Sequence, residues 1–240
     1  MDKERKVYPG RTAAVTPLGV AENMEKTLQE NSSSESAVLT KKNIFREYGE
    51  AILIAVILAL FIRTFVVQAF KIPSGSMKPT LLVGDHILVN KFIYGIKIPF
   101  SDITLIPFKE PKRGDIVVFK FPEDPKKDFI KRVIAVEGEK IQIRNKKVYI
   151  DDKPIDNPYG TFLDPHYIPG GAQPRDNLGP VTVPPDSFFV MGDNRDHSYD
   201  SRFWGCVKLS ALKGKAFIMY WSWDKENSGV RWRRLGRLVY

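Results

Sequence analysis

Cysteine is almost absent from the 240 residues of this chain, in which Cys206 stands alone. One thiol cannot form a disulfide within the chain, and it cannot supply a thiolate-based structural zinc site. Cys206 follows Trp204 and Gly205 directly, a setting more typical of a small buried residue than of a nucleophile. Cysteine usage thus excludes two kinds of stabilising site and does not indicate a compartment.

Motifs for nucleic-acid binding are also absent, although the formal net charge is +9. The chain lacks a helix-turn-helix, a zinc finger and the aromatic pattern of an RNA-recognition strand. A basic chain without these motifs is better suited to the anionic headgroups of a bilayer. We therefore expect phospholipid, and not nucleic acid, as a partner.

One long apolar run stands out in a chain of otherwise globular composition. It extends from Ala51 to Phe70, is unbroken as far as Ile62, and as a helix would span ~30 Å, about one bilayer core. A cleaved signal would start nearer the N-terminus, and a buried soluble helix would carry a polar face. The run predicts a single transmembrane helix over residues 48–70, in which Arg63 can extend toward the interface.

The charges that flank this run indicate its direction. Lys41, Lys42 and Arg46 precede it, whereas Lys71 and Lys78 follow it. Positive charge gathers on the cytoplasmic side of membrane segments. We expect residues 1–47 to form a mobile cytoplasmic tail, and residues 71–240 to form a domain outside the cytoplasm.

The sequence after residue 71 is typical of a mainly β, antiparallel protein. Short runs rich in valine, isoleucine and phenylalanine alternate with turn signals, without helical segments between them. Residues 152–186 are rich in proline, glycine and aspartate, so we expect about 139–186 to be a smaller inserted β and loop subdomain. The expected strands cover residues 85–92, 115–121, 129–136, 140–144, 147–150, 187–191 and 216–223.

A serine-rich turn follows the apolar run, with the sequence Ile72-Pro73-Ser74-Gly75-Ser76-Met77-Lys78-Pro79-Thr80. Its prolines and glycine fix an irregular backbone that can present a hydroxyl at a surface. A serine hydroxyl needs a base to remove its proton, but neither His86 nor His166 lies in a supporting motif. The turn is not a hydrolase elbow either, because Lys78 occupies the position of the second glycine.

Lysine is the other available base, provided that an apolar site lowers its pKa. Strand alternation in Phe129-Ile130-Lys131-Arg132-Val133 places Lys131 on one face with Phe129 and Val133, among apolar neighbours. Arg132 cannot deprotonate, so Lys131 is the only possible base of the two. The strand alone fits an edge strand with protective charges more readily than a catalytic site.

A third polar stretch runs from Gly192 to Gly205 and is dense in hydrogen-bonding side chains. A calcium loop is disfavoured, because Arg195 replaces an oxygen ligand. The stretch can be an ordinary loop network, or it can support a catalytic pair, with Asp200 and Arg202 as a charge pair and Ser198 bonded to the base.

Four motifs, at residues 72–80, 112–119, 129–133 and 192–205, occur in the order and at the approximate spacings of bacterial type I signal peptidase. From the apolar run to Trp232, the chain resembles this family. The resemblance implies an antiparallel β core with an inserted β subdomain. It also implies a serine–lysine endopeptidase of the bacterial cytoplasmic (inner) membrane, which cleaves signal peptides from exported preproteins without metal or cofactor. From the one apolar run we expect a single-pass protein, and we expect it to function as a monomer.

The resemblance also implies roles for individual residues. Ser76 matches the nucleophile and Lys131 the general base, while the Ser74 hydroxyl and the Ser76 backbone N–H match the oxyanion hole. Ser198 matches the residue that orients Lys131, supported by Asp200 and Arg202. The residues that match the lining of the substrate pockets are Phe70, Ile72, Met77, Leu81, Phe129 and Ile130.

The chain departs from the family pattern in three places. His197 stands where the family often has asparagine, Tyr199 where it often has a small residue, and one membrane segment is expected where many members have two. Two other functions compete with the resemblance. A self-cleaving serine–lysine switch protein would be soluble, which the apolar run disfavours. A membrane-tethered β domain that binds or assembles without catalysis would have an exposed, ordinary Lys131.

Overall fold

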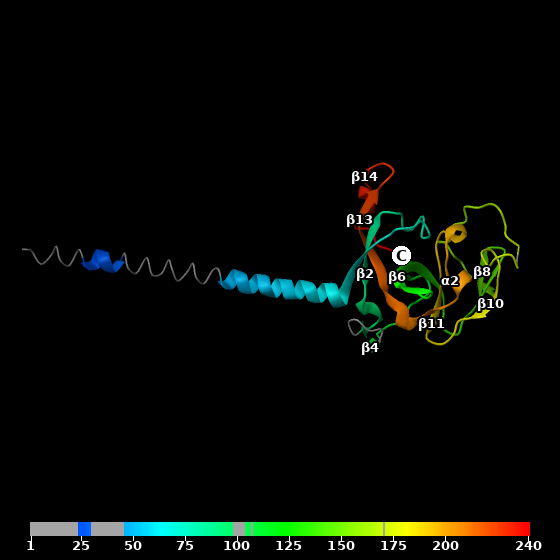
Figure 1. Ribbon diagram of the computed structural model, residues 1–240, viewed down its shortest axis with the longest axis horizontal. Helices are drawn as coiled ribbons and strands as arrows, with labels where there is room; N and C mark the ends of the chain where they lie inside the picture. The colour runs from blue at the N-terminus through cyan, green and yellow to red at the C-terminus, as the bar shows by residue number, and fades with distance from the viewer. Residues whose placement is uncertain (1–23, 30–45, 98–103, 107, 170) are drawn as a thin grey trace, which may run out of the picture. The chain divides into compact units, whose positions relative to one another are not determined.

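The computed structural model describes residues 24–29, 46–97, 104–106, 108–169 and 171–240 (Figure 1). The chain divides into two compact units, Met1–Leu58 and Ala59–Tyr240, and all described strands lie in the second. Residues 24–29 and 46–61 are helical. Most of the predicted tail at 1–47 lies outside the described residues.

The predicted helix over residues 48–70 is wrong at its C-terminal end. The helix passes through a π-helical turn at Ile62–Val66 into strand β1, Val67–Lys71, which pairs with β2 and places Phe70 opposite Ile87. Apolar content did not distinguish helix from strand here, because Phe70 packs against the sheet core. Within the part of the chain that the structure describes, no helix combines the length and apolar character needed to cross a membrane.

The main sheet has eight strands in the order β1-β2-β13-β5-β6-β11-β12, with β14 paired to β13. Every pair in it is antiparallel, so the predicted antiparallel β core is confirmed. The strands after β1 are β2 (Asp85–Asn90), β5 (Ile116–Phe121), β6 (Asp124–Val136), β11 (Ser187–Met191), β12 (Val207–Lys208), β13 (Leu212–Asp224) and β14 (Gly229–Val230).

A second sheet, with the order β10-β7-β8-β9, is formed by the chain between β6 and β11. Its strands lie within the range 139–186 that the sequence assigns to an insertion. Figure 1 shows β8 and β10 at the end of the unit Ala59–Tyr240 away from β14. The strands are β7 (Lys140–Arg144), β8 (Lys147–Ile150), β9 (Lys153–Pro154) and β10 (Leu178–Thr182), and a separate pair joins β3 (Ile96–Lys97) to β4 (Thr104–Ile106).

Alternation along β5 divides the core between two faces of the main sheet. Ile116 and Val118 belong to one apolar cluster, and Val117 and Phe119 belong to another. The first cluster also contains Ile72, Met77 and Leu81 from the serine-rich turn, all buried. The core therefore holds the turn directly against the sheet.

Candidate active site

Ser76 lies in the turn between β1 and β2, next to the fully buried Met77. Two backbone bonds shape this turn: Lys78 N–H donates to Gly75 O at 3.1 Å, and Leu81 N–H donates to Met77 O at 2.9 Å. Because Met77 and Leu81 are locked in the core, the Ser76 hydroxyl is held in a defined place. Only 8% of the Ser76 surface is exposed.

Lys131 extends from β6 toward this hydroxyl. Its Nζ donates to Ser76 Oγ at 2.8 Å and to Ile130 O at 3.1 Å. The Lys131 side chain also lies over the Phe129 ring, with Nζ 5.3 Å from the centroid, and the residue is 4% exposed. The two residues that the sequence analysis selected are therefore in contact, although 55 positions separate them.

Burial changes the acid–base chemistry of Lys131. Loss of hydration lowers the pKa of Lys131 from 10.5 to about 8 and is the largest effect. Asp200 opposes this shift, Arg202 adds to it, and Asp193 opposes it in turn. An amine with this pKa has a substantial neutral fraction in mildly alkaline solution and can accept a proton there.

The loop after β11 holds the serine turn from its other side. Asn194 N–H donates to Ser76 O at 3.1 Å, and Asn194 Nδ2 donates to Gly75 O at 3.3 Å. Thr80 Oγ1 donates to Asp193 Oδ2 at 2.6 Å. The sequence analysis flagged this stretch as a polar network, but it did not single out Asn194, Asp193 or Thr80, whose role depends on contacts with a distant turn.

Two buried ion pairs lie beside the catalytic candidates. Arg132 Nε and Nη2 each donate to the Asp193 carboxylate at 2.7 Å, and Arg202 Nε and Nη2 each donate to Asp200 at 2.8 Å. Asp200 also accepts the Gly192 N–H at 3.0 Å and caps helix α2, Ser201–Trp204. The pair Asp200–Arg202 was expected; the pair Arg132–Asp193 was not.

The structure does not support the predicted bond between Ser198 and Lys131. The Ser198 hydroxyl is buried and has no hydrogen-bond partner among the described residues. It lies against Gly192, where an added Cβ would overlap both Ser198 Oγ and Ser76 O. Ser198 is therefore next to the site, but the carbonyl of Ile130 is what holds the lysine amine.

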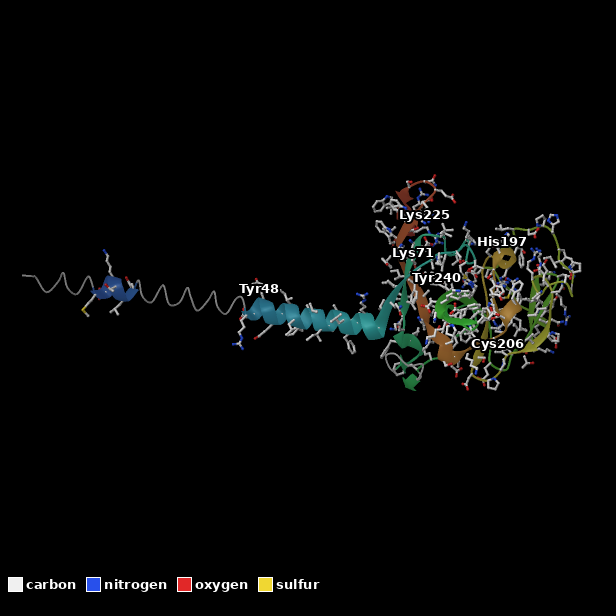
Figure 2. All side chains as sticks on the ribbon, in the orientation of Figure 1. Tyr48, Lys71, His197, Cys206, Lys225 and Tyr240 are labelled. Atoms are coloured by element: carbon white, nitrogen blue, oxygen red, sulfur yellow. The ribbon has the colours of Figure 1, made fainter. Side chains whose placement is uncertain are left out.

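An open cleft of about 510 Å³ contains both Ser76 and Lys131. Phe129 and Ile130 line it as expected, but Phe70, Ile72, Met77 and Leu81 are not part of its lining and pack in the core behind the turn. Figure 2 labels His197, which lines this cleft, and Cys206, which is not part of its lining. The cleft is lined by Pro73, Ser74, Gly75, Ser76, Lys78, Asp128, Phe129, Ile130, Lys131, Asn194, His197 and Tyr199.

Tyr199 is one of the residues that line the cleft. Its hydroxyl donates to Glu123 Oε2 at 3.1 Å, and this bond raises the pKa of Tyr199. The ring packs near Phe121 and Phe203, with centroids 6.2 and 5.4 Å away. The bulky residue flagged in the sequence therefore forms part of the cleft wall.

The remaining histidines, His86 and His166, lie away from the cleft. His86 packs edge-on to Tyr220, and His166 contacts the Asp164 carboxylate, both outside the cleft lining. Within the described parts of the chain, no group of three or more histidine, cysteine, aspartate and glutamate side chains is placed to hold a metal ion.

Comparison with known proteins shows the family. Residues 45–221 match the family described as signal peptidase, peptidase S26. The chain is 34% identical over 244 residues to signal peptidase I of Pseudomonas aeruginosa, covering 90% of this chain and 84% of that one. It is 37% identical over 203 residues to a probable signal peptidase I-2 of Synechocystis, covering 82% of each.

Among solved structures, a signal peptidase I from Enterococcus faecalis is 28% identical, with a TM-score of 0.36, covering 45% of this chain and 97% of that one. The family match extends from before the serine turn to β13, and so includes every residue of the cleft. The chain belongs to the signal peptidase family, peptidase S26.

Replacing Lys131 by methionine should stabilise the fold at pH 7. Below pH 8 the folded protein holds a buried charge, a penalty on the order of 3 kcal/mol from the shift between 10.5 and about 8. From pH 8 to 10.5 the unfolded chain binds a proton that the folded chain does not, so wild-type stability rises. The advantage of Lys131→Met should therefore shrink over that range in urea unfolding.

The matched control for this prediction is Lys153→Met, at an exposed lysine of the second sheet. Its free energy of unfolding should track the wild type at both pH 7 and pH 10. A Lys131→Met protein that is less stable than the wild type at pH 7, or a gap that does not depend on pH, would show that burial does not penalise the ammonium.

Proposed function

We propose that the chain is a serine endopeptidase that removes signal peptides from exported preproteins, with Ser76 as nucleophile and Lys131 as general base. The observation that carries the proposal is the 2.8 Å contact between Ser76 Oγ and a buried amine with a lowered pKa. All residues of the site come from one chain, so a monomer suffices. Neither a metal nor an organic cofactor is required.

The reaction is an acyl transfer in two stages. Neutral Lys131 accepts the Ser76 proton as Ser76 Oγ attacks the scissile carbonyl, and the resulting ammonium protonates the leaving amine. The product of this first stage is an ester between Ser76 and the signal peptide. Lys131, neutral again, then activates a water molecule that hydrolyses this ester and regenerates the serine.

The substrate binds along the open edge of β6. Strand β11 pairs only with the C-terminal part of β6, from Arg132 to Val136, so residues 124–131 have no strand partner on that side among the described strands. An extended peptide can add to such an edge through main-chain hydrogen bonds. Phe129 and Ile130 then offer shallow apolar contacts suited to the small side chains before the cut.

An oxyanion hole lies at the same turn. The Ser74 hydroxyl is 3.5 Å from Ser76 Oγ, and none of the hydrogen bonds among the described residues uses the Ser76 N–H. The Ser76 N–H is therefore available to the oxygen that becomes negative during attack, and the Ser74 hydroxyl, which contacts Ser76 Oγ in the free site, lies close enough to turn toward it. Donors of this kind stabilise the transition state more than the bound substrate.

Ser76→Ala and Lys131→Arg should each abolish processing of a preprotein, because one lacks the attacking oxygen and the other cannot act as a base. In the wild type, kcat/KM should rise with pH and level off above the Lys131 pKa of about 8, since only the neutral amine accepts the proton. Cleavage of a purified preprotein at several pH values measures both.

The control is Ser210→Ala, an exposed serine outside the cleft, which should process normally. Activity in Lys131→Arg would transfer the role of base to another group. Normal binding of preprotein without any cleavage by the wild type would instead favour a non-catalytic binding module.

Ser74→Ala should leave a reduced but measurable rate. One oxyanion donor contributes about 3 kcal/mol to the transition state, while the Ser76 N–H remains. The loss should therefore appear in kcat, roughly a hundredfold, with little change in KM. Steady-state kinetics on a peptide substrate separates the two, and a change confined to KM would show that Ser74 contacts the substrate only.

The apolar segment tethers the enzyme to the bacterial cytoplasmic membrane, with the N-terminus in the cytoplasm and the catalytic unit outside. Support comes from the unbroken apolar sequence from Ala51 to Ile62, whose large side chains are exposed on the helix. The full chain should remain in the membrane fraction after alkaline carbonate extraction. Its release into the supernatant would contradict the tether, and an external protease that fails to reach the catalytic unit in spheroplasts would contradict the orientation.

A further inference from the structure

A short segment of the insertion, residues 157–161, contacts the loop that holds the nucleophile. Thr161 N–H donates to Asp193 O at 2.7 Å, and Arg195 N–H donates to Thr161 O at 2.9 Å, so Thr161 pairs with Asn194 as in a parallel bridge. The Tyr159 ring lies 3.8 Å from the Arg132 guanidinium. The segment therefore contacts the loop after β11 and also Arg132, which belongs to the buried Arg132–Asp193 ion pair.

Gly160 lies between these two contacts, directly against Arg195. A Cβ added to Gly160 would lie 2.9 Å from Arg195 Cζ and 3.1 Å from both terminal nitrogens. The Arg195 side chain is only 1% exposed, and its Nε donates to Gly192 O at 3.0 Å. Its two terminal nitrogens have no hydrogen-bond partner among the described residues, so the Nε bond and the close packing around the buried group are what restrict its movement.

The path from this segment to Ser76 is short. Thr161 bonds to the backbone on each side of Asn194, and Asn194 N–H donates to Ser76 O at 3.1 Å. Gly192 O accepts a hydrogen bond from Arg195 Nε. A side chain at position 192 would overlap Ser198 Oγ and Ser76 O. A displacement of Arg195 therefore reaches the nucleophile through both Gly192 and Asn194.

We infer that Gly160 is a positioning residue for Ser76: its bare Cα lets the insertion pack on Arg195, and the paired loop then holds the nucleophile in register with Lys131. The inference rests on the proposed function for its kinetic consequence, and on the contacts of Gly160, Thr161 and Asn194 for the coupling itself. It gives the insertion between β6 and β11, which carries none of the cleft residues, a part in the alignment of the reacting groups.

Gly160→Ala should lower kcat roughly tenfold, because misplacement of a reacting atom by a fraction of an ångström already slows an oriented reaction. KM should stay within about twofold of the wild type, since the open edge of β6 is untouched. The matched control is Gly179→Ala on β10 of the same insertion, where an added Cβ meets nothing within 4 Å. This control should match the wild type in kcat, KM and thermal midpoint.

Arg195→Lys distinguishes positioning from general destabilisation. Lysine lacks the planar guanidinium that the new methyl group contacts, so Gly160→Ala/Arg195→Lys should be severalfold more active than Gly160→Ala alone. Arg195→Lys by itself should be less active than the wild type, because it loses the bond to Gly192 O. This reversal of sign requires coupling between the two positions.

A readout without catalysis completes the test. Hydrogen exchange of peptides that contain Asn194 should be faster in Gly160→Ala than in the wild type and unchanged in Gly179→Ala. Unchanged exchange, an unchanged kcat in Gly160→Ala, or a double variant no better than the single one would each overturn the inference. If Gly160→Ala does not fold, Tyr159→Leu must show the same loss of kcat and faster exchange. A wild type that cleaves no preprotein would refute the proposed function, while exchange would still decide the coupling.

Discussion

The contact between the Lys131 amine and the Ser76 hydroxyl is the constraint on which the rest of the structure depends. The amine must be kept from water to lose its proton, yet it must remain within reach of a hydroxyl at the edge of a cleft. The fold meets both conditions by placing the lysine on β6 and the serine on a turn whose neighbours Met77 and Leu81 are buried in the core. Rigidity of the turn thus comes from ordinary apolar packing.

The charges around the lysine are arranged so that they do not undo its burial. Asp193 and Asp200 both favour the protonated amine, but each is bonded at two positions to an arginine, Arg132 and Arg202. A carboxylate paired in this way exerts a weaker electrostatic attraction on a third group. The same carboxylates also bond to Thr80 and to the Gly192 N–H. Electrostatic tuning and mechanical support of the site are therefore carried by the same two residues.

Side-chain patterns predicted much of the molecule. The runs at residues 140–144, 147–150 and 187–191 match β7, β8 and β11, because short runs rich in β-branched or aromatic residues and bounded by turns leave few other options. Longer strands were cut short: β6 begins at Asp124, where its exposed charged residues gave no apolar signal. The predicted C-terminal end of the helix was wrong for the opposite reason, because the apolar residues of β1 continue the apolar run of the helix.

The candidate site likewise contains residues that side-chain patterns predict and contacts that they do not. Ser76 and Lys131 could be selected from the sequence because their side chains carry the chemistry. The bond from the Asn194 N–H to Ser76 O and the bonds of Thr161 to the loop use backbone atoms of segments far apart in the chain, and these leave no trace in residue types. The orientation of Ser198 depends on rotamers within that loop, and it could not be read from the motif.

The open edge of β6 also bears on how these molecules behave toward one another at high concentration. A strand with unsatisfied main-chain groups can pair with the same strand of a second copy and so begin a polymer. Here that edge starts with Pro125, which donates no hydrogen bond, followed by the exposed Lys126, Lys127 and Asp128. Two copies approaching edge to edge would bring these lysines together. The missing donor at Pro125 and the repulsion between these lysines therefore disfavour pairing of two copies along this edge.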